Sequence, residues 1–137
     1  MAQKVHFPDD YQNLLLNRSI SRTSSLRTLN PFLDGNLVMR LNGRLAKSPL
    51  MSYTEKYPII LPYSSRYTIL LVNFIHLITI HGGNQLMMRI IRIEFWIPKL
   101  KVLVRTVINR CKPCILEKKR ACTQIMAALP PERTSLD

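Results

Sequence analysis

Two stretches of the sequence are decisive for the fold, HLITIHGGNQ at residues 76–85 and VLVRTVINRCKPC at residues 102–114. Between them they supply four side chains that commonly bind metals: His76, His81, Cys111 and Cys114. Zn²⁺ prefers four tetrahedral ligands of the imidazole and thiolate type, and a structural site fills all four positions with protein side chains. We therefore predict one Zn²⁺ per chain, held by these four residues.

The spacing of the four residues indicates where the helices must end. His76 and His81 would point apart on one continuous helix, so the helix must end between them. Gly82-Gly83 should end it, because glycine readily takes the left-handed conformation found just past a helix end. Cys111 and Cys114 are separated by two residues, a spacing common among zinc ligand pairs. A region with short helices and a small core is also of a size at which a metal usually supplies stability.

Each half of this pattern has other interpretations when taken alone. A Cys-x-x-Cys pair also occurs as a redox dithiol, although no βαβ pattern surrounds this one, and His76 is compatible with a satisfied core histidine. Cys122 is either a spare thiol or a replacement for one histidine, and its distance from Cys114 in the sequence makes it the weaker ligand candidate. We expect His6, in a polar segment, to be exposed to solvent.

Three helices are predicted around these residues. The first runs from about residue 66 to 80, and the second from Asn84, as N-cap, to Pro98. The third, from about residue 99 to 110, carries a buried stripe, and residues 115–126 are expected to form a short last helix. Apolar residues that share one face of the second helix are Leu86, Ile90, Ile93 and Ile97. The stripe of the third helix consists of Leu100, Leu103, Val104, Val107, Ile108 and Cys111.

The expected fold is mainly α, with three to four helices bundled around one zinc and a small β segment before them. Residues 1–30 have little periodicity and are expected to be a flexible, poorly ordered connector. Residues 31–62 should hold a hairpin that turns at Asn42-Gly43 and a proline-bounded edge strand or extended segment at residues 58–62. The zinc-binding domain then spans residues 63–122, and residues 123–137 form a tail.

The chain is strongly basic, with 20 Lys and Arg against 8 Asp and Glu and a formal charge of +12. Such a charge favours a polyanionic partner, nucleic acid first and an anionic membrane surface second. Many of the cations lie in the zinc-binding region, where they form either a phosphate-binding face or an ordinary solvated helix surface. The candidate nucleic-acid-binding residues are Arg89, Arg92, Lys99, Lys101, Arg105, Lys118, Lys119 and Arg120.

The pattern H-x4-H, then 29 residues, then C-x2-C, resembles the zinc-binding amino-terminal domain of retroviral and retrotransposon integrases. The flanking stretches resemble the part of BEL/Pao-type retrotransposon polyproteins between the RNase H region and the integrase catalytic core. They include LNPFLDGNLVMRLNGRL (29–45), YPIILP (57–62), EFWIP (94–98) and LPPER (129–133). The resemblance implies a helical zinc fold, a role in integrase self-assembly and contact with the DNA ends of the element.

The chain departs from that family in its acidic residues. The family's catalytic core follows the LPPER-like segment and carries spaced acids for metal-dependent strand transfer, whereas the acids of this chain are scattered and form no two-metal cluster. We therefore expect no catalytic site in it. The leading hypothesis is a zinc-binding, nucleic-acid-binding and self-assembly module of a retrotransposon-type integrase, which binds duplex DNA ends mainly through phosphates. The alternative is a structural protein–protein interaction module that is held by zinc and has no role on DNA.

The expected partners, besides nucleic acid, are further copies of the chain or other integrase domains. The amino terminus is polar where a secretory signal would be apolar, and the longest apolar stretch, residues 67–80, is too short to span a membrane. We expect an intracellular protein, in the nucleus or in a retroelement particle, that is neither secreted nor bound to membranes.

Overall fold

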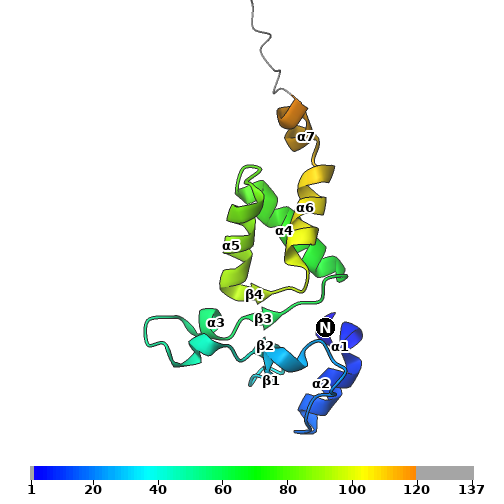
Figure 1. Cartoon of the computed structure of the whole chain (residues 1–137), viewed down its shortest axis with the longest axis vertical. Helices are drawn as coiled ribbons and strands as arrows, with labels where there is room; N and C mark the ends of the chain where they lie inside the picture. Colours follow the sequence, from blue (N-terminus) through cyan, green and yellow to red (C-terminus); the bar gives the residue numbers. More distant parts are fainter. Residues whose placement is uncertain (1, 120–137) are drawn as a thin grey trace, which may run out of the picture.

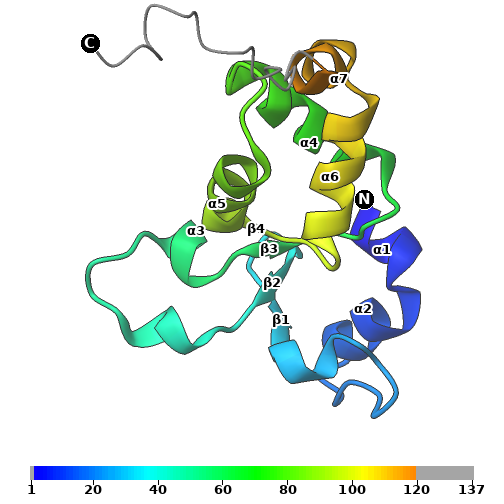
Figure 2. The same ribbon diagram turned by 45° about the horizontal axis from the view of Figure 1, so that its top comes forward.

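The computed structural model describes residues 2–119. Figures 1 and 2 show a small sheet with the two amino-terminal helices on one side and the carboxy-terminal helices on the other. The helices are α1 (Ala2–His6), α2 (Pro8–Leu15), α3 (Tyr53–Lys56), α4 (Arg66–Ile78), α5 (Asn84–Glu94), α6 (Leu100–Arg110) and α7 (Lys112–Lys119). The strands are β1 (Pro31–Leu33), β2 (Met39–Leu41), β3 (Ile59–Ile60) and β4 (Phe95–Trp96). The mainly helical fold predicted from the sequence is confirmed.

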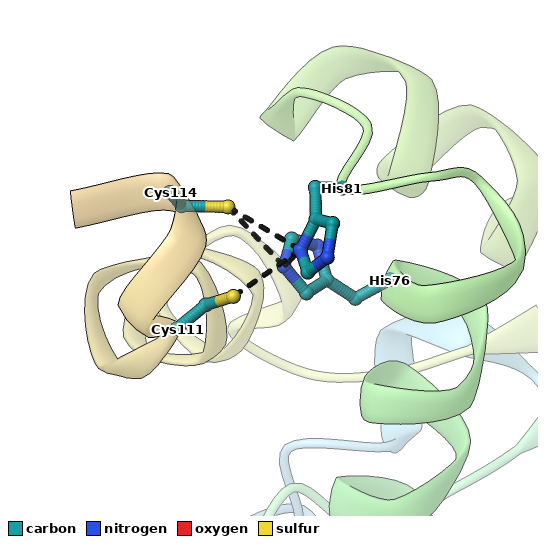
Figure 3. Close-up of side chains that lie close together, drawn as sticks. All are labelled: His76, His81, Cys111 and Cys114. Atoms are coloured by element: carbon teal, nitrogen blue, oxygen red, sulfur yellow. Dashed lines mark hydrogen bonds between the residues drawn. The ribbon is translucent and has the colours of Figure 1, made fainter. Parts of the chain in front are cut away.

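Helices α4, α5 and α6 pack around the larger of two apolar cores. The predicted stripe of α6 is confirmed from Leu100 to Ile108, whose apolar side chains are buried there. The face predicted for the second helix is right only in part. Ile97 is buried and Ile90 packs against the core, but Leu86 and Ile93 are exposed. The buried side chains of α5 itself are Met87, Met88 and Ile91. The C-terminal ends of α4 and α6 meet where the four predicted zinc ligands lie (Figure 3).

The second helix is also shorter than predicted. α5 ends at Glu94 and not at Pro98, because Phe95 and Trp96 pair as a parallel strand with β3. Its N-cap is Gly83, one residue before the predicted Asn84. Tertiary pairing with the sheet overrides the helical periodicity at this end.

The hairpin exists, but its turn is not at Asn42-Gly43. β1 and β2 pair antiparallel, with Leu33 opposite Met39, so the chain turns over residues 34–38. The Asp34 side chain accepts hydrogen bonds from the backbone N–H groups of Asn36 and Val38, both at 2.9 Å, which closes this turn without a glycine at positive φ. Gly43 has an extended backbone and precedes a 3₁₀ turn.

The segment of β3 is not an edge strand. β3 pairs antiparallel with β2 and parallel with β4, so the sheet order is β1-β2-β3-β4. The flanking Pro58 and Pro62 lie just outside the two paired residues, where a missing N–H costs no ladder bond. The parallel pairing of β3 with β4 joins the β segment to the helical region.

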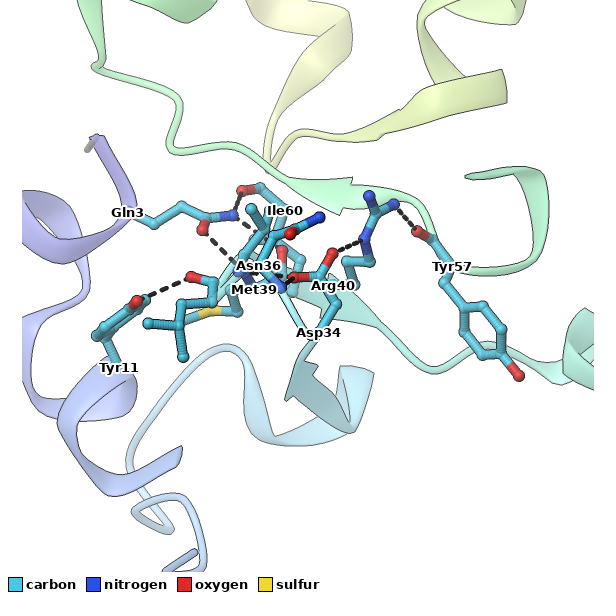
Figure 4. A network of polar contacts seen from close by, with 10 residues as sticks. Gln3, Tyr11, Asp34, Asn36, Met39, Arg40, Tyr57 and Ile60 are labelled. Atoms are coloured by element: carbon cyan, nitrogen blue, oxygen red, sulfur yellow. Dashed lines mark hydrogen bonds and ion pairs between the residues drawn. The ribbon is translucent and has the colours of Figure 1, made fainter. Parts of the chain in front are cut away.

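Residues 1–30, expected to be a poorly ordered connector, instead hold α1, α2 and a second small core. Tyr11 and Leu26 are buried in that core with Met39 and Ile60 of the sheet. The buried Gln3 side chain donates to the backbone carbonyls of Met39 at 2.8 Å and Ile60 at 2.6 Å, and accepts from the Met39 N–H (Figure 4). These bonds satisfy sheet groups that no periodicity in the sequence indicates.

No helix among residues 2–119 has the length and the apolar character needed to cross a membrane.

Asp34 also holds the one ion pair found among the described residues, with Arg40 Nε at 2.7 Å. Arg40 donates in turn to the Tyr57 carbonyl at 2.9 Å (Figure 4). Burial opposes ionisation of the carboxyl, but the Arg40 guanidinium and the Val38 and Asn36 N–H groups outweigh it and lower the pKa of Asp34. A carboxylate with a lowered pKa stabilises the folded state above its unfolded-state pKa of about 3.9, and this contribution is lost as the pH falls through the folded-state value.

We expect Asp34→Ala to lower the free energy of unfolding by about 3 kcal/mol at neutral pH, because it opens the turn and leaves a buried guanidinium unpaired. Denaturant unfolding of the zinc-loaded protein measures this. The control is Asp9→Ala, which removes an exposed carboxylate and should cost less than about 1 kcal/mol. Equal effects of the two substitutions would contradict the structural role of Asp34.

Candidate metal centre

The ligand atoms of His76, His81, Cys111 and Cys114 all lie within 4.8 Å of one another (Figure 3). His76 Nε2 and His81 Nδ1 are 3.1 Å apart, and Cys111 Sγ is 3.2 Å from His81 Nδ1. Cys114 Sγ is 3.4 Å from His76 Nε2 and 3.7 Å from His81 Nδ1. Two nitrogens and two sulfurs therefore converge on one point between α4 and α7.

Hydrogen bonds alone do not explain this convergence. A neutral imidazole nitrogen has either one hydrogen or one lone pair, whereas His81 Nδ1 lies close to three polar atoms. A tetrahedral zinc site with bonds of about 2.0 Å to nitrogen and 2.3 Å to sulfur places ligand atoms about 3.3–3.8 Å apart. The four distances given above, 3.1–3.7 Å, lie close to these values, and no pair of ligand atoms is more than 4.8 Å apart. The donor set and its geometry therefore fit one Zn²⁺.

The two histidines are brought together by the way α4 ends. The Ile80 N–H donates to the Leu77 carbonyl and the His81 N–H donates to the His76 carbonyl, each at 3.0 Å. With Thr79 as C-cap, these are the two bonds of a Schellman motif, which joins the backbone of the residue two past the cap to the residue three before it. Those two residues commonly make an apolar contact, and here they are the two imidazoles.

The prediction that the glycines take the left-handed conformation is wrong. Positive φ occurs at Ile80 (52°) and His81 (60°), and both glycines have negative φ. Gly82 is needed for a different reason, since an added Cβ would lie 2.8 Å from Thr79 Oγ1. That hydroxyl accepts from the Gly82 N–H and donates to the Ile75 carbonyl, so Thr79 closes the turn in a way that the ligand spacing does not reveal.

The two cysteines lie where α6 passes into α7. Cys111 is the C-cap of α6, and its carbonyl accepts from the Ile115 N–H, so it also precedes the first turn of α7. Pro113 fits in that first turn, where N–H groups have no helical partner. Cys114 follows one turn after Cys111, on the same side.

Burial sets the protonation of the metal-free site. His76 is 3% exposed, and its pKa is lowered first by burial and then by the neighbouring His81, so the imidazole is neutral and has a lone pair for a metal. The pKa of Cys114 is raised by burial and by the Cys111 thiol. Zinc must therefore displace protons, and its affinity should fall as the pH falls. His76 Nδ1, which points away from the ligand cluster, is buried and has no hydrogen-bond partner within residues 2–119.

Two further sequence predictions concern cysteine and histidine residues. His6 is exposed, as expected, with Ser64 Oγ 3.2 Å from its Nδ1. Cys122 lies outside the described residues, so its role stays a prediction. Arg120 lies outside them as well, whereas the other seven candidate nucleic-acid-binding residues are all exposed.

The helical arrangement and the four convergent side chains define a zinc-binding helical module with a site for one Zn²⁺. Residues 61–120 match the family model of the integrase zinc binding domain, and the match includes all four clustered residues. It covers somewhat less than half of the 137 residues. The comparisons with curated proteins and with solved structures give no match. This segment is therefore similar to the zinc-binding domain of integrases, and its four clustered residues could hold one Zn²⁺.

We expect the wild-type chain to bind one Zn²⁺, and Cys111→Ser or His76→Ala to abolish tight binding and to melt α4, α6 and α7. The apparent binding energy of such sites, about 10–16 kcal/mol, exceeds the stability of a small domain. Metal analysis and circular dichroism measure both effects. Cys122→Ser and His6→Ala are the controls and should retain one zinc. Full zinc content in Cys111→Ser would show that the cluster is not the site.

We expect Ile80→Gly to stabilise the zinc-loaded protein by about 0.5–1 kcal/mol. A β-branched residue at positive φ costs about 1–2 kcal/mol, partly offset by the greater freedom of glycine in the unfolded chain. The side chain is 86% exposed, so little packing is lost. Ile80→Ala removes most of the same side chain but retains Cβ, and should gain less in the same thermal unfolding assay. Equal stability of the two variants would exclude backbone strain as the cause.

Proposed function

We propose that the chain is a non-catalytic module of a BEL/Pao-type retrotransposon integrase that binds nucleic acid and self-assembles only when it holds zinc. The family match supports the integrase and zinc parts of this proposal. The observation that carries the nucleic-acid part is a track of exposed cations along α5, α6 and α7. We propose duplex DNA ends as the ligand, and the nucleus or a retroelement particle as the place of action.

Along α6 the cations follow one helical row. Lys101 and Arg105 are four residues apart and both exposed, and Asn109 continues the row by a further four residues. Lys118 Nζ of α7 donates to Asn109 Oδ1 at 3.3 Å, so the cations of α7 adjoin the end of this row. Residues 101–118 thus present positive charge over the length of α6 and into α7.

The track extends past the other end of α6. Arg92, Lys99 and Lys101 line one hollow of about 240 Å³, together with Trp96. Arg89 lies one turn before Arg92 on α5, and both residues border a second hollow. The cations at the start of α6 and those of α5 are therefore neighbours in space.

These cations have no carboxylate partners among residues 2–119, where the only ion pair is between Arg40 and Asp34. Unpaired lysine and arginine side chains can neutralise phosphates and release counterions, which favours binding at low salt. They lie on several elements, and no single helix presents them as a reading surface, so we propose contacts mainly to phosphates with little sequence preference.

The test is a DNA titration at several salt concentrations with the zinc-loaded protein. Lys101→Gln with Arg105→Gln should lower the slope of log affinity against log salt by about 1.8, at about 0.9 per phosphate contact. Zinc content and helicity should not change, because neither residue is a ligand or buried.

The matched control is Arg18→Gln with Arg22→Gln, which removes the same charge from exposed positions after α2, at the other end of the molecule. This variant should retain the wild-type slope. If the wild type does not bind even at low salt, the alternative applies, and the module serves protein contacts alone.

A further inference from the structure

α4 has a second apolar face, opposite the one that it buries. Its core-facing residues are Thr68, Val72, Ile75 and His76. On the outer side lie five large apolar side chains, each between 54% and 64% exposed. We call them the outer α4 face: Tyr67, Leu70, Phe74, Leu77 and Ile78. Their spacing of three or four residues places them in one stripe along the helix.

The exposed apolar area of this stripe matches that of the largest apolar patch on a typical soluble monomer, and such patches are often functional. Fully exposed aromatic side chains offer about 150–250 Å² each, so five large residues at this exposure present on the order of 500 Å². The largest apolar patch of a typical monomer is about 300–600 Å², and one side of a standard protein interface buries about 800 Å². Apolar residues of α5 extend the face toward the area that one side of a standard interface buries.

That extension is a groove of about 270 Å³ between α4 and α5. Phe74 and Leu71 line it from α4, and Ile90 and Ile93 line it from α5. Ile90 and Ile93 both belong to the stripe that the sequence predicted on the second helix; Ile90 also packs against the core, whereas Ile93 is exposed. Glu94 is the one charged residue that lines the groove.

The charge of the face argues against nucleic acid as its occupant. Residues 67–80 contain no Lys, Arg, Asp or Glu, although the chain as a whole carries +12. Phe74 belongs to the outer α4 face and also borders the groove, so the face and the groove form one patch. A two-fold interface needs such a self-complementary patch, because each copy must offer both halves of the contact.

We propose that the outer α4 face is the interface between two copies of this chain, with Phe74 of each copy entering the groove between α4 and α5 of the other. This inference rests on the self-assembly part of the proposed function and names the surface for it. α4 ends at the zinc ligands His76 and His81, so the interface should form only in the zinc-loaded protein.

Sedimentation of the zinc-loaded chain at concentrations up to about 100 µM tests the proposal, because this range detects dissociation constants in the micromolar range. The wild type should form dimers. Phe74→Glu should raise the dissociation constant of the dimer at least about 100-fold, because the two-fold symmetry buries one added charge from each copy in the interface. Leu70→Glu is a second variant that does not border the groove and should act in the same direction.

The matched control is Val102→Glu, which replaces an exposed apolar residue of α6 outside the face and should leave dimerisation unchanged. Salt separates this inference from the proposed binding of DNA. Salt screens the repulsion between two strongly basic chains, so it should strengthen the dimer, whereas it should weaken binding to DNA. Zinc content should be equal in all variants.

A wild type that stays monomeric at high salt would overturn the inference, even if the face bound lipid vesicles instead. Normal dimers in both Phe74→Glu and Leu70→Glu would overturn it as well. Binding of DNA by such a monomer would leave the nucleic-acid part of the proposed function standing. Dimers without binding to DNA would support the interface and contradict that part.

Discussion

The helical region depends on how α4 ends. The bonds from the Ile80 and His81 N–H groups to the Leu77 and His76 carbonyls reverse the chain within one turn and place two imidazoles 3.1 Å apart. Cys111 and Cys114 complete the set from the junction of α6 and α7. A zinc ion on these atoms would tie the ends of two helices that share one core, and the strain at Ile80 and His81 is what this geometry costs.

More of the candidate site than of the fold could be predicted from the sequence. The ligand types and their spacing indicate zinc, because few combinations of histidine and cysteine satisfy its tetrahedral preference. The turn that joins the histidines could not be predicted, since the positive φ lies at Ile80 and His81 and not at the glycines. Gly82 is required by the closeness of the Thr79 side chain, which only the folded chain reveals.

The errors in the fold have a shared physical cause, which is hydrogen bonding by particular side chains and strands that periodicity and turn preferences do not encode. The hairpin turns where the Asp34 carboxylate collects N–H groups and Arg40, and not at the dipeptide with the strongest local turn preference. α5 ends at Glu94 because β3 pairs with the next two residues. Gln3 organises the amino terminus by hydrogen bonds to Met39 and Ile60, for which helical or strand periodicity gives no signal.

The composition of α4 connects the two surfaces of the molecule. A helix with apolar residues on two opposite faces is normally covered on both, yet among residues 2–119 α5 and α6 cover α4 on one side alone. The basic track on α6 gives no reason for the exposed Leu70, Phe74 and Leu77, because phosphates bind cations and not apolar side chains. A partner that covers the outer α4 face accounts for these residues and leaves the cations of α6 free for a polyanion. One zinc site would then hold two surfaces in place. Rising salt weakens the binding of DNA to one of them and strengthens the binding of a second copy to the other.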